Sequence, residues 1–469
     1  MKEITSLISV NFLLQNPLAI SLYHEFAAVL PIVDYHNHID ETHLAANHSF
    51  QDLYDVWVNT DPYKHRAMRI NGIPEKFITG PGSNKVKFLR WSKTMPMTVG
   101  NPLYHWSIME LNHVFGINYA LNENNAESIW EECNSKLKKE EYTAISLLKK
   151  WNVETLCTSD DWLNDLTVHA KASTRSGTHV LPSLRADKIL NFNGSNYREY
   201  LERLGNAERQ KIESLNELKS IILLRLSYFN KYGCKLSDHT LDSGFSYHLP
   251  TDNEAHNLFS KSLNGELLAT KDVYSLQSYL LSFLGKEYSK LEWVMQLHIG
   301  AQRHTSSRLR KMAGASGGYA SIGKACDINS LCNYLDDLEK DGHLPDIILY
   351  TLNPSDNEAF ASLTGSYSED GKPGKVQFGP AWWYNDHLGG IEKHLKTIAE
   401  YSLLSRFIGM TTDSRSLLSF SRHDYFRRIL CNLIGEWVLK GVLPNDRIIL
   451  KQLIINICYK NSKNALSHG

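Results

Sequence analysis

The sequence has no paired cysteine motif and no excess of charge of either sign. Its seven cysteines are an odd number, and none stands in a Cys-x-x-Cys pair, which argues against a disulfide framework and against zinc-ribbon spacing. The formal net charge is -1, so neither a nucleic-acid surface nor an acidic tail is indicated. Reduced thiols are typical of the cytoplasm, and we therefore expect a cytoplasmic protein that does not bind nucleic acid.

Long apolar runs and glycine-rich signatures are also missing. Asn11, Gln15, Asn16 and Pro17 interrupt the apolar residues near the N-terminus, which fall short of the ~20 that a membrane span requires. There is no P-loop, no Rossmann glycine fingerprint and no Gly-x-Ser-x-Gly nucleophile elbow. These absences argue against membrane insertion, nucleotide binding and serine hydrolase chemistry.

What is present is a series of short β-rich runs, each ending in a polar or charged residue. The runs are Ile32–His36, Val153–Thr158, Thr178–Leu184, Cys234–His239, Val294–His298, Ile347–Leu352, Lys375–Phe378 and Phe407–Thr412. Stretches with helical periodicity separate most of them, as at Ile391–Leu404 and Tyr425–Val438. Strands that alternate with helices favour a parallel sheet, and eight such strands favour closure of that sheet into a barrel. We predict an α/β protein with a distorted (β/α)8 TIM-like barrel in a single domain over residues 1–469.

The first two runs are separated by far more chain than one helix needs. About 115 residues lie between them, whereas connections in such barrels are usually short. Helical patterns within this stretch cover Asp52–Val58, Lys85–Ser92, Leu103–Phe115 and Ala126–Lys149. We predict that residues 41–151 form a large helical insertion after strand one, which caps the mouth of the barrel.

Two histidines near the end of the first run are candidate metal ligands. Side chains alternate along a strand, so His36 and His38 face the same way and can bind one ion. Two unrelated polar histidines are the alternative, because the chain contains 20 histidines. Asp413 follows the eighth run, which lies next to the first when a barrel closes. An aspartate there commonly caps a helix, but together with the histidine pair we favour a metal ligand.

Other polar residues lie at or beyond the ends of further runs. His239 and His298 each end a run, where barrel strands deliver catalytic groups, although a lone buried histidine is often structural. Arg185, Arg303 and Arg415 can hold a carboxylate, or can form surface ion pairs. Trp382 and Trp383 can form an aromatic wall against a sugar, or can simply pack.

These residues lie in longer blocks that resemble the uronate isomerase family. The blocks run in order through nearly the whole chain and include Tyr35–His38, Asn101–Trp106, Leu156–Asp161, Gly233–His239, Gln377–Gly379, Trp382–Trp383, Gly409–Ser416 and Arg422–Asn432. The resemblance implies membership of the amidohydrolase superfamily and a distorted (β/α)8 barrel. It also implies interconversion of D-glucuronate with D-fructuronate, and of D-galacturonate with D-tagaturonate.

Roles follow from the resemblance for several residues. It implies that His36, His38 and Asp413 bind one divalent metal ion, with zinc expected before manganese or another ion. It implies that Arg185, Arg415 and Trp382 or Trp383 belong to the substrate region. We further expect His239 and Arg303 in that region, and Asp413 as the proton-transferring base, with Tyr63 or His298 as alternatives. A small uronic acid is the expected partner, and the protein is expected to form a homo-oligomer.

The match departs from the family at two places. Where the family has His-Tyr-Lys-Trp-Arg, this chain has Pro62-Tyr63-Lys64-His65-Arg66, and the family's Asn-rich run after Arg303 is replaced by His304–Ser307. Two other functions therefore stay open. One is a metal-dependent hydrolase, although His239 ends strand four where such enzymes often have a bridging lysine. The other is a uronate-binding homologue with weak or no turnover, for which Pro62 is the best argument.

Overall fold

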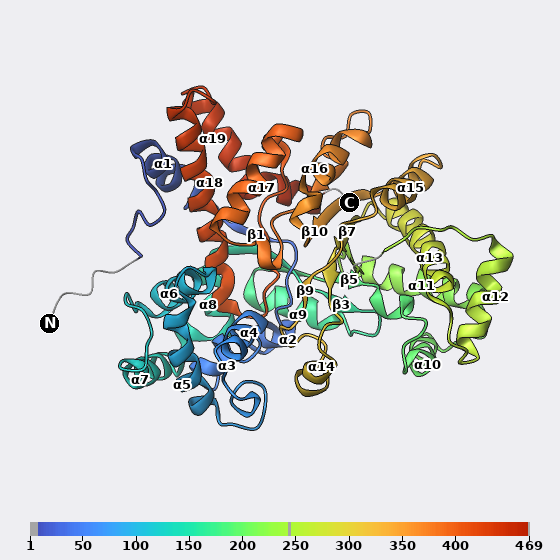
Figure 1. The fold of residues 1–469 in the computed structure, drawn as a ribbon, viewed down its shortest axis with the longest axis horizontal. Coiled ribbons are helices and arrows are strands. Elements are labelled where there is room, and N and C mark those ends of the chain that lie inside the picture. The colour runs from blue at the N-terminus through green and yellow to red at the C-terminus, as the bar shows by residue number, and fades with distance from the viewer. Residues whose placement is uncertain (1–7, 243–244, 468–469) are drawn as a thin grey trace.

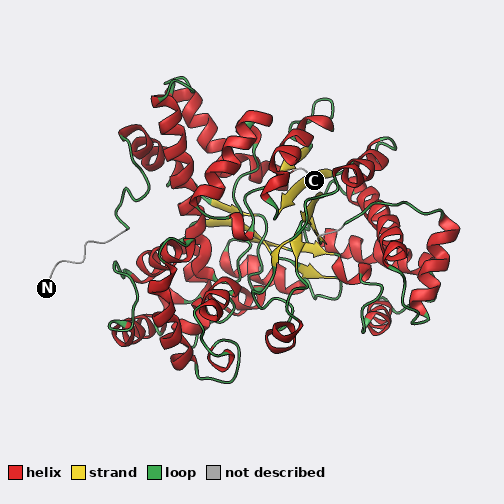
Figure 2. Cartoon of the chain, viewed as in Figure 1, coloured by secondary structure: helices red, strands yellow, loops and turns green. Residues whose placement is uncertain are grey.

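Parallel strands occupy the centre of the molecule and helices surround them (Figure 1). The structure is a computed structural model that describes residues 8–242 and 245–467. Figure 2 shows the strands gathered in the middle, with helical layers on both sides. No helix in these described ranges is long and apolar enough to cross a membrane.

The strands form two parallel sheets and one small antiparallel pair. The first sheet has the order β1-β2-β4, the second β11-β10-β7-β6-β5-β3, and the pair is β8-β9. The strands are β1 (Ile32–Asp34), β2 (Val153–Cys157), β3 (Asp160–Asp161), β4 (His179–Leu181), β5 (Ser183–Arg185), β6 (Leu236–Leu241), β7 (Val294–Ile299), β8 (Ala301–Gln302), β9 (Ser321–Ile322), β10 (Asp346–Thr351) and β11 (Val376–Phe378). All predicted runs except Phe407–Thr412 therefore recur in parallel strands, and the α/β class is confirmed.

Two predicted strands are each bent into two pieces. The run Thr178–Leu184 appears as β4 and β5, separated by Pro182, which lacks the N–H that a ladder requires. The run Val153–Thr158 continues after a break as β3, which pairs with β5. Because both breaks lie at the same level, they divide the ladder into two sheets and distort the barrel.

The prediction of a regular strand over Phe407–Thr412 is wrong, although its predicted place beside β1 is right. The segment follows β1 through bonds from His38 N to Ser414 O (2.8 Å) and from Asp413 N to His36 O (3.0 Å). Gly409 and Asp413 have φ angles of 93° and 48°, outside the strand region. A Cβ on Gly409 would collide with the carbonyl oxygen of Ile457, so close packing against the C-terminal helices requires glycine here.

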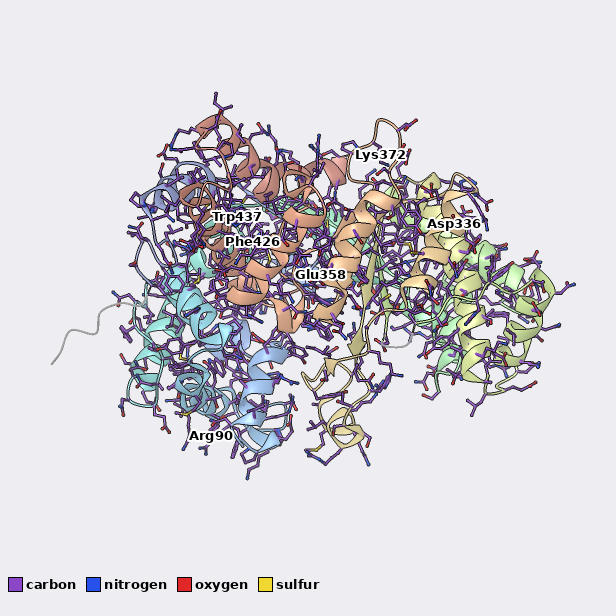
Figure 3. All side chains as sticks on the ribbon, turned by 45° about the horizontal axis from the view of Figure 1, so that its top comes forward. Arg90, Asp336, Glu358, Lys372, Phe426 and Trp437 are labelled. Carbon is purple, nitrogen blue, oxygen red and sulfur yellow. The ribbon has the colours of Figure 1, made fainter. Side chains whose placement is uncertain are left out.

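Helices fill the stretch between β1 and β2. They are α2 (Glu41–Ala46), α3 (Leu53–Trp57), α4 (Pro62–Ile70), α5 (Asn84–Thr94), α6 (Pro102–Phe115), α7 (Ala126–Leu137) and α8 (Ala144–Lys150). They gather at the lower left of Figure 1, and Figure 3 labels Arg90 of α5 at the edge of this group. The predicted helix Ala126–Lys149 is two helices, because residues 138–143 turn the chain. That residues 41–151 act as a cap remains a prediction.

The remaining helices surround the strands. They are α1 (Pro17–Leu22), α9 (Thr167–Ser176), α10 (Tyr197–Ala207), α11 (Leu215–Lys231), α12 (Asp252–Leu263), α13 (Thr270–Lys290), α14 (Ser307–Ala313), α15 (Ile328–Glu339), α16 (Asn357–Ser366), α17 (Leu388–Tyr401), α18 (Ser421–Leu439), α19 (Arg447–Ile455) and α20 (Asn461–Ser467). All residues of β7 are buried, which explains its nearly continuous apolar sequence.

Candidate active site

A cavity of about 800 Å³ opens at the carboxyl ends of the strands. All but one of the residues predicted for the site contribute to its wall. Those lining residues are His36, His38, Tyr63, Arg185, His298, Arg303, Trp382, Trp383, Asp413 and Arg415. The carboxyl ends of barrel strands are where such folds carry their chemistry, so the position supports the predicted site.

The three predicted metal ligands converge in this cavity. His36 Nε2 lies 3.5 Å and His38 Nε2 lies 3.0 Å from Oδ1 of Asp413. Ligand atoms about 2.1 Å from one ion are separated by roughly 3 to 3.5 Å, so the three atoms have the spacing of a shared coordination sphere. Two imidazole nitrogens and a carboxylate oxygen form a donor set that fits a divalent transition metal.

The ionisation of these groups favours a cation. Burial would raise the pKa of Asp413, but hydrogen bonds from His36 and His38 hold it well below its usual range. Burial lowers the pKa of His38 to about 4, which leaves a neutral imidazole. Burial also lowers the pKa of His36, but the carboxylates of Asp238 and Asp413 outweigh it and raise that pKa overall. Metals bind an ionised carboxylate and neutral imidazoles, so Asp413 and His38 have the required charge and His36 would lose its proton when an ion binds.

A buried carboxylate that the sequence analysis missed, Asp34, holds the two ligand-bearing segments together. It accepts hydrogen bonds from Thr412 N (2.7 Å), Thr411 Oγ1 (2.9 Å) and Thr412 Oγ1 (2.7 Å). His423 of α18 reaches the same carboxylate at 3.1 Å. Asp34 therefore fixes the irregular eighth segment against β1, and so fixes Asp413 relative to His36.

The indole groups of the two tryptophans contact the metal-facing aspartate. Trp382 and Trp383 donate Nε1–H bonds of 3.0 and 2.6 Å to Oδ2 of Asp413. Because His36 and His38 approach the other oxygen, Oδ1, the carboxylate has a fixed orientation. The tryptophans were predicted to contact substrate, and the structure adds this orienting contact.

His298 lies in the cavity with a carboxylate partner of its own. Its Nδ1 is 2.9 Å from Oδ1 of Asp238, and its ring centroid is 4.8 Å from that of His36. Its Nε2 has no hydrogen-bonding partner among the described residues. Burial lowers the pKa of His298, although Asp238 opposes this. His36, Asp238 and His298 also come close enough to form a second candidate ligand group that shares His36 with the first.

The structure does not bring His239 to the cavity. In the pairing of β6 with β7, Thr240 lies opposite His298 and Asp238 opposite Gln296, whereas His239 lies opposite Leu297. Alternation therefore places Asp238 and Thr240 on the cavity side and His239 on the other, beside Tyr288. The sequence analysis missed Asp238. Alternation within β6 leaves Asp238 and His239 as equal choices, and only the register against β7 decides between them.

The three predicted arginines have different partners. Arg185 is 2.9 Å from Asp187 and 3.6 Å from Asp238, while Arg303 is 3.0 Å from Asp242 and lies over Trp383. Arg415 forms no ion pair within the described residues, although it lines the cavity. Burial lowers the pKa of Arg415, with Asp413 opposing that effect. An arginine without a carboxylate partner is suited to bind the carboxylate of a ligand.

The first turn of α4 forms one wall of the cavity. Asp61 caps the helix, Pro62 is its first residue, and both Pro62 and Tyr63 line the cavity. The Tyr63 hydroxyl is buried without a partner among the described residues, and burial raises its pKa well above the usual range. His65 is buried outside the cavity wall, and burial lowers its pKa to about 4.

Comparisons with known proteins agree with this geometry. The family model described as glucuronate isomerase matches residues 4–466. A uronate isomerase from Caldanaerobacter subterraneus subsp. tengcongensis is 42% identical over 97% of this chain and 98% of its own length. The crystal structure of a uronate isomerase from Thermotoga maritima is 34% identical, with a TM-score of 0.92, and covers 98% of this chain and 99% of that one.

More distant structures share the fold alone. A glucuronate isomerase from Caulobacter crescentus is 24% identical with a TM-score of 0.90, over 98% of this chain and 97% of that chain. A protein described as a putative metal-dependent hydrolase from Lactobacillus casei is 15% identical with a TM-score of 0.55, over 95% and 97%. The distorted barrel thus occurs in both kinds of protein.

Proposed function

Because the chain belongs to the glucuronate isomerase family, we propose that it interconverts aldose and ketose forms of uronic acids. The proposed pairs are D-glucuronate with D-fructuronate and D-galacturonate with D-tagaturonate. The observation that carries this proposal is the cavity itself, where a metal-ligand set faces the same space as Arg415, which has no ion pair among the described residues. Such a pocket can orient a sugar by its carboxylate while its other end meets the metal site.

The reaction moves a proton between C2 and C1 of the sugar and shifts hydroxyl protons. His36, His38 and Asp413 would hold a divalent ion, and that ion would supply Lewis acidity toward the sugar oxygens. Asp413 is the proposed base, and the two indole N–H groups hold its carboxylate in place. Tyr63 and His298 are the alternative proton carriers. Arg415 would bind the substrate carboxylate, with Arg185, Arg303 and the tryptophans completing the substrate surface.

The finer details are proposals as well. We propose zinc as the ion, because a nitrogen and carboxylate donor set suits it, with manganese as the alternative. The hydrolase alternative is not favoured, since β6 presents Asp238 rather than a lysine to the cavity. We also propose a cytoplasmic homo-oligomer in which residues 41–151 cap the barrel.

A uronate panel tests the function directly. Metal-reconstituted protein is incubated with each uronate, and ketose formation is measured. We expect ketose from D-glucuronate and D-galacturonate. Binding of a uronate without any ketose would instead show a binding homologue.

We predict that one divalent ion per chain depends on His36 and Asp413. His36→Ala removes an imidazole and Asp413→Ala removes a carboxylate from the same donor set, so each should lose most of the bound metal. Elemental analysis of purified protein measures this. His239→Ala is the matched control, because that histidine is also buried but faces away from the cavity. Full metal content in both ligand variants would show that the ion binds elsewhere.

We predict that Arg415→Met weakens uronate binding specifically. Loss of a charge-assisted pair costs about 1.5–3 kcal/mol, which is roughly a 10- to 100-fold rise in KM for D-glucuronate. The inhibition constant of neutral D-glucose should change little. Arg225→Met is the control, since Arg225 is a buried arginine that pairs with Glu208, outside the cavity lining. If the variant bound D-glucuronate and D-glucose more weakly by the same factor, Arg415 would have a structural role.

A further inference from the structure

A buried lysine, Lys64, lies behind the cavity wall, next to Tyr63 in the first turn of α4. Only 1% of its side chain is exposed, and its Nζ lies 2.6 Å from Asp61 Oδ2 and 3.2 Å from Glu110 Oε2. Lysine is rarely buried unless it is paired, and here it has two carboxylate partners. Because both partners engage the ammonium group and Lys64 does not line the 800 Å³ cavity, it has no direct contact with the proposed reaction.

The lysine and its partners fix the backbone that carries Tyr63. Asp61 Oδ1 accepts the backbone N–H groups of Tyr63 (2.8 Å) and Lys64 (3.1 Å), while its Oδ2 accepts from Lys64 Nζ. One carboxylate therefore holds both the helix start and the buried ammonium group. Removing the ammonium group would leave Asp61 buried beside the helix without its counter-charge.

Glu110 connects this cluster to the rest of the site. It lies on α6, which belongs to the same group of helices as α4 (Figure 1), and it is 1% exposed. Its Oε1 accepts a 3.3 Å bond from Ser419, in the short helix Leu417–Phe420 that follows the Asp413 segment. Trp106 lies one helical turn before Glu110 and meets the Tyr63 ring edge-on at 6.0 Å. One face of α6 thus contacts both the Tyr63 ring and, through Lys64, its backbone.

Tyr63 depends on such support because its hydroxyl has no hydrogen-bonding partner in the part of the chain that the structure describes. That oxygen is buried, and no described residue bonds to it, so the ring and backbone contacts alone hold it in the cavity. A smaller cavity of about 310 Å³ is lined by Asp61, Tyr63, Glu110 and Asp413, among others. Asp61 and Glu110 therefore line a space that Tyr63 and Asp413 also line, while Lys64 lies behind them.

We propose that Lys64 is a positioning residue, which aligns the Tyr63 hydroxyl through its ion pairs with Asp61 and Glu110. The proposal rests on the isomerase function and on a role for Tyr63 in it. Lys64 acts on catalysis only through Tyr63, so its removal has no further effect on turnover once the hydroxyl is gone. Small misplacements of a reacting group can lower rates by about 10²-fold.

A double-mutant cycle tests the proposal in the metal-loaded enzyme. Lys64→Met, Tyr63→Phe and the double variant are compared by kcat, KM and thermal midpoint. We expect Lys64→Met to lower kcat about 10²-fold with little change in KM. In the Tyr63→Phe background the same change should lower kcat less than about 3-fold, while its effect on the thermal midpoint persists. Lys64→Arg, which keeps the charge, should recover most of the lost kcat.

Controls separate this outcome from simple destabilisation. Should Lys64→Met not fold, Lys64→Met/Glu110→Gln replaces it, because that pair leaves less uncompensated buried charge. Lys87→Met removes another buried lysine of the helical insertion that lies outside the cavity lining, and should leave kcat unchanged. The proposal would be overturned if Lys64→Met lowered kcat by the same factor in the Tyr63→Phe background as in the wild type. Wild-type protein without ketose formation would instead refute the isomerase function, before any variant is compared.

Discussion

Asp413→Asn is expected to lower kcat for uronate isomerisation by roughly 10⁴-fold, the upper end of the range for loss of a general base. The aspartate combines two proposed tasks, since it contributes an oxygen to the metal group and is the first candidate for proton transfer. Asparagine is the informative replacement. Asp413 has φ 48°, a conformation that asparagine adopts readily and alanine does not, so the variant changes chemistry with little added backbone strain.

The measurement pairs turnover with metal content in the same preparation. Asp356→Asn is the matched control, because Asp356 is also buried and accepts hydrogen bonds from Cys326 N and Thr351 Oγ1, away from the cavity lining. Asp356→Asn should lower the stability of the protein but have little effect on kcat. An Asp413→Asn enzyme with its metal retained and kcat within about 10-fold of wild type would exclude Asp413 as the base, and would direct attention to Tyr63 or His298.

The sequence was sufficient for the parts of the fold that repeat locally. β7 and β10 are buried on both faces, so their apolar runs are visible without any tertiary information. The pair His36 and His38 was predicted from alternation along one strand. Both side chains line the cavity, although β1 ends at Asp34 and both histidines follow it. Barrel closure, which places the eighth run beside the first, then supplied the partner Asp413, and the family resemblance implied the same three ligands.

What the sequence could not supply depends on tertiary contacts. The irregular path of residues 407–412 is set by packing of Gly409 against Ile457 and by bonds to Asp34, both distant in the chain. His239 and Asp238 are neighbours, and only the register of β6 against β7 decides which one faces the cavity. The pairing of Lys64 with Glu110 likewise joins two helices whose packing no local pattern predicts.

The structure also bears on Pro62, where the family has histidine. Proline at the first position of a helix lacks an N–H that would be unpaired anyway, so α4 begins without cost. Its ring lines the cavity but offers no donor, acceptor or titratable group. His65 was a possible substitute, but it is buried outside the cavity wall, where Asp61, Arg69, Glu75 and Lys87 surround it. The positions of Pro62 and His65 therefore indicate that the contacts of the family's histidine are lost in this chain and that His65 does not replace them.

Pro62→His is accordingly expected to raise kcat/KM for D-glucuronate and D-galacturonate by about 10²- to 10⁴-fold, the range typical of a general acid or base. The new imidazole would enter a cavity with room for it, and the Pro62 carbonyl that packs against Gly318 is unchanged by the substitution. His65→Ala should not change kcat/KM in either the wild type or the Pro62→His variant, because the His65 ring does not reach the cavity. A collapse of activity in His65→Ala would show that α4 rearranges to present His65. Strong wild-type turnover that neither substitution alters would mean that no histidine in this turn has an essential role in the reaction.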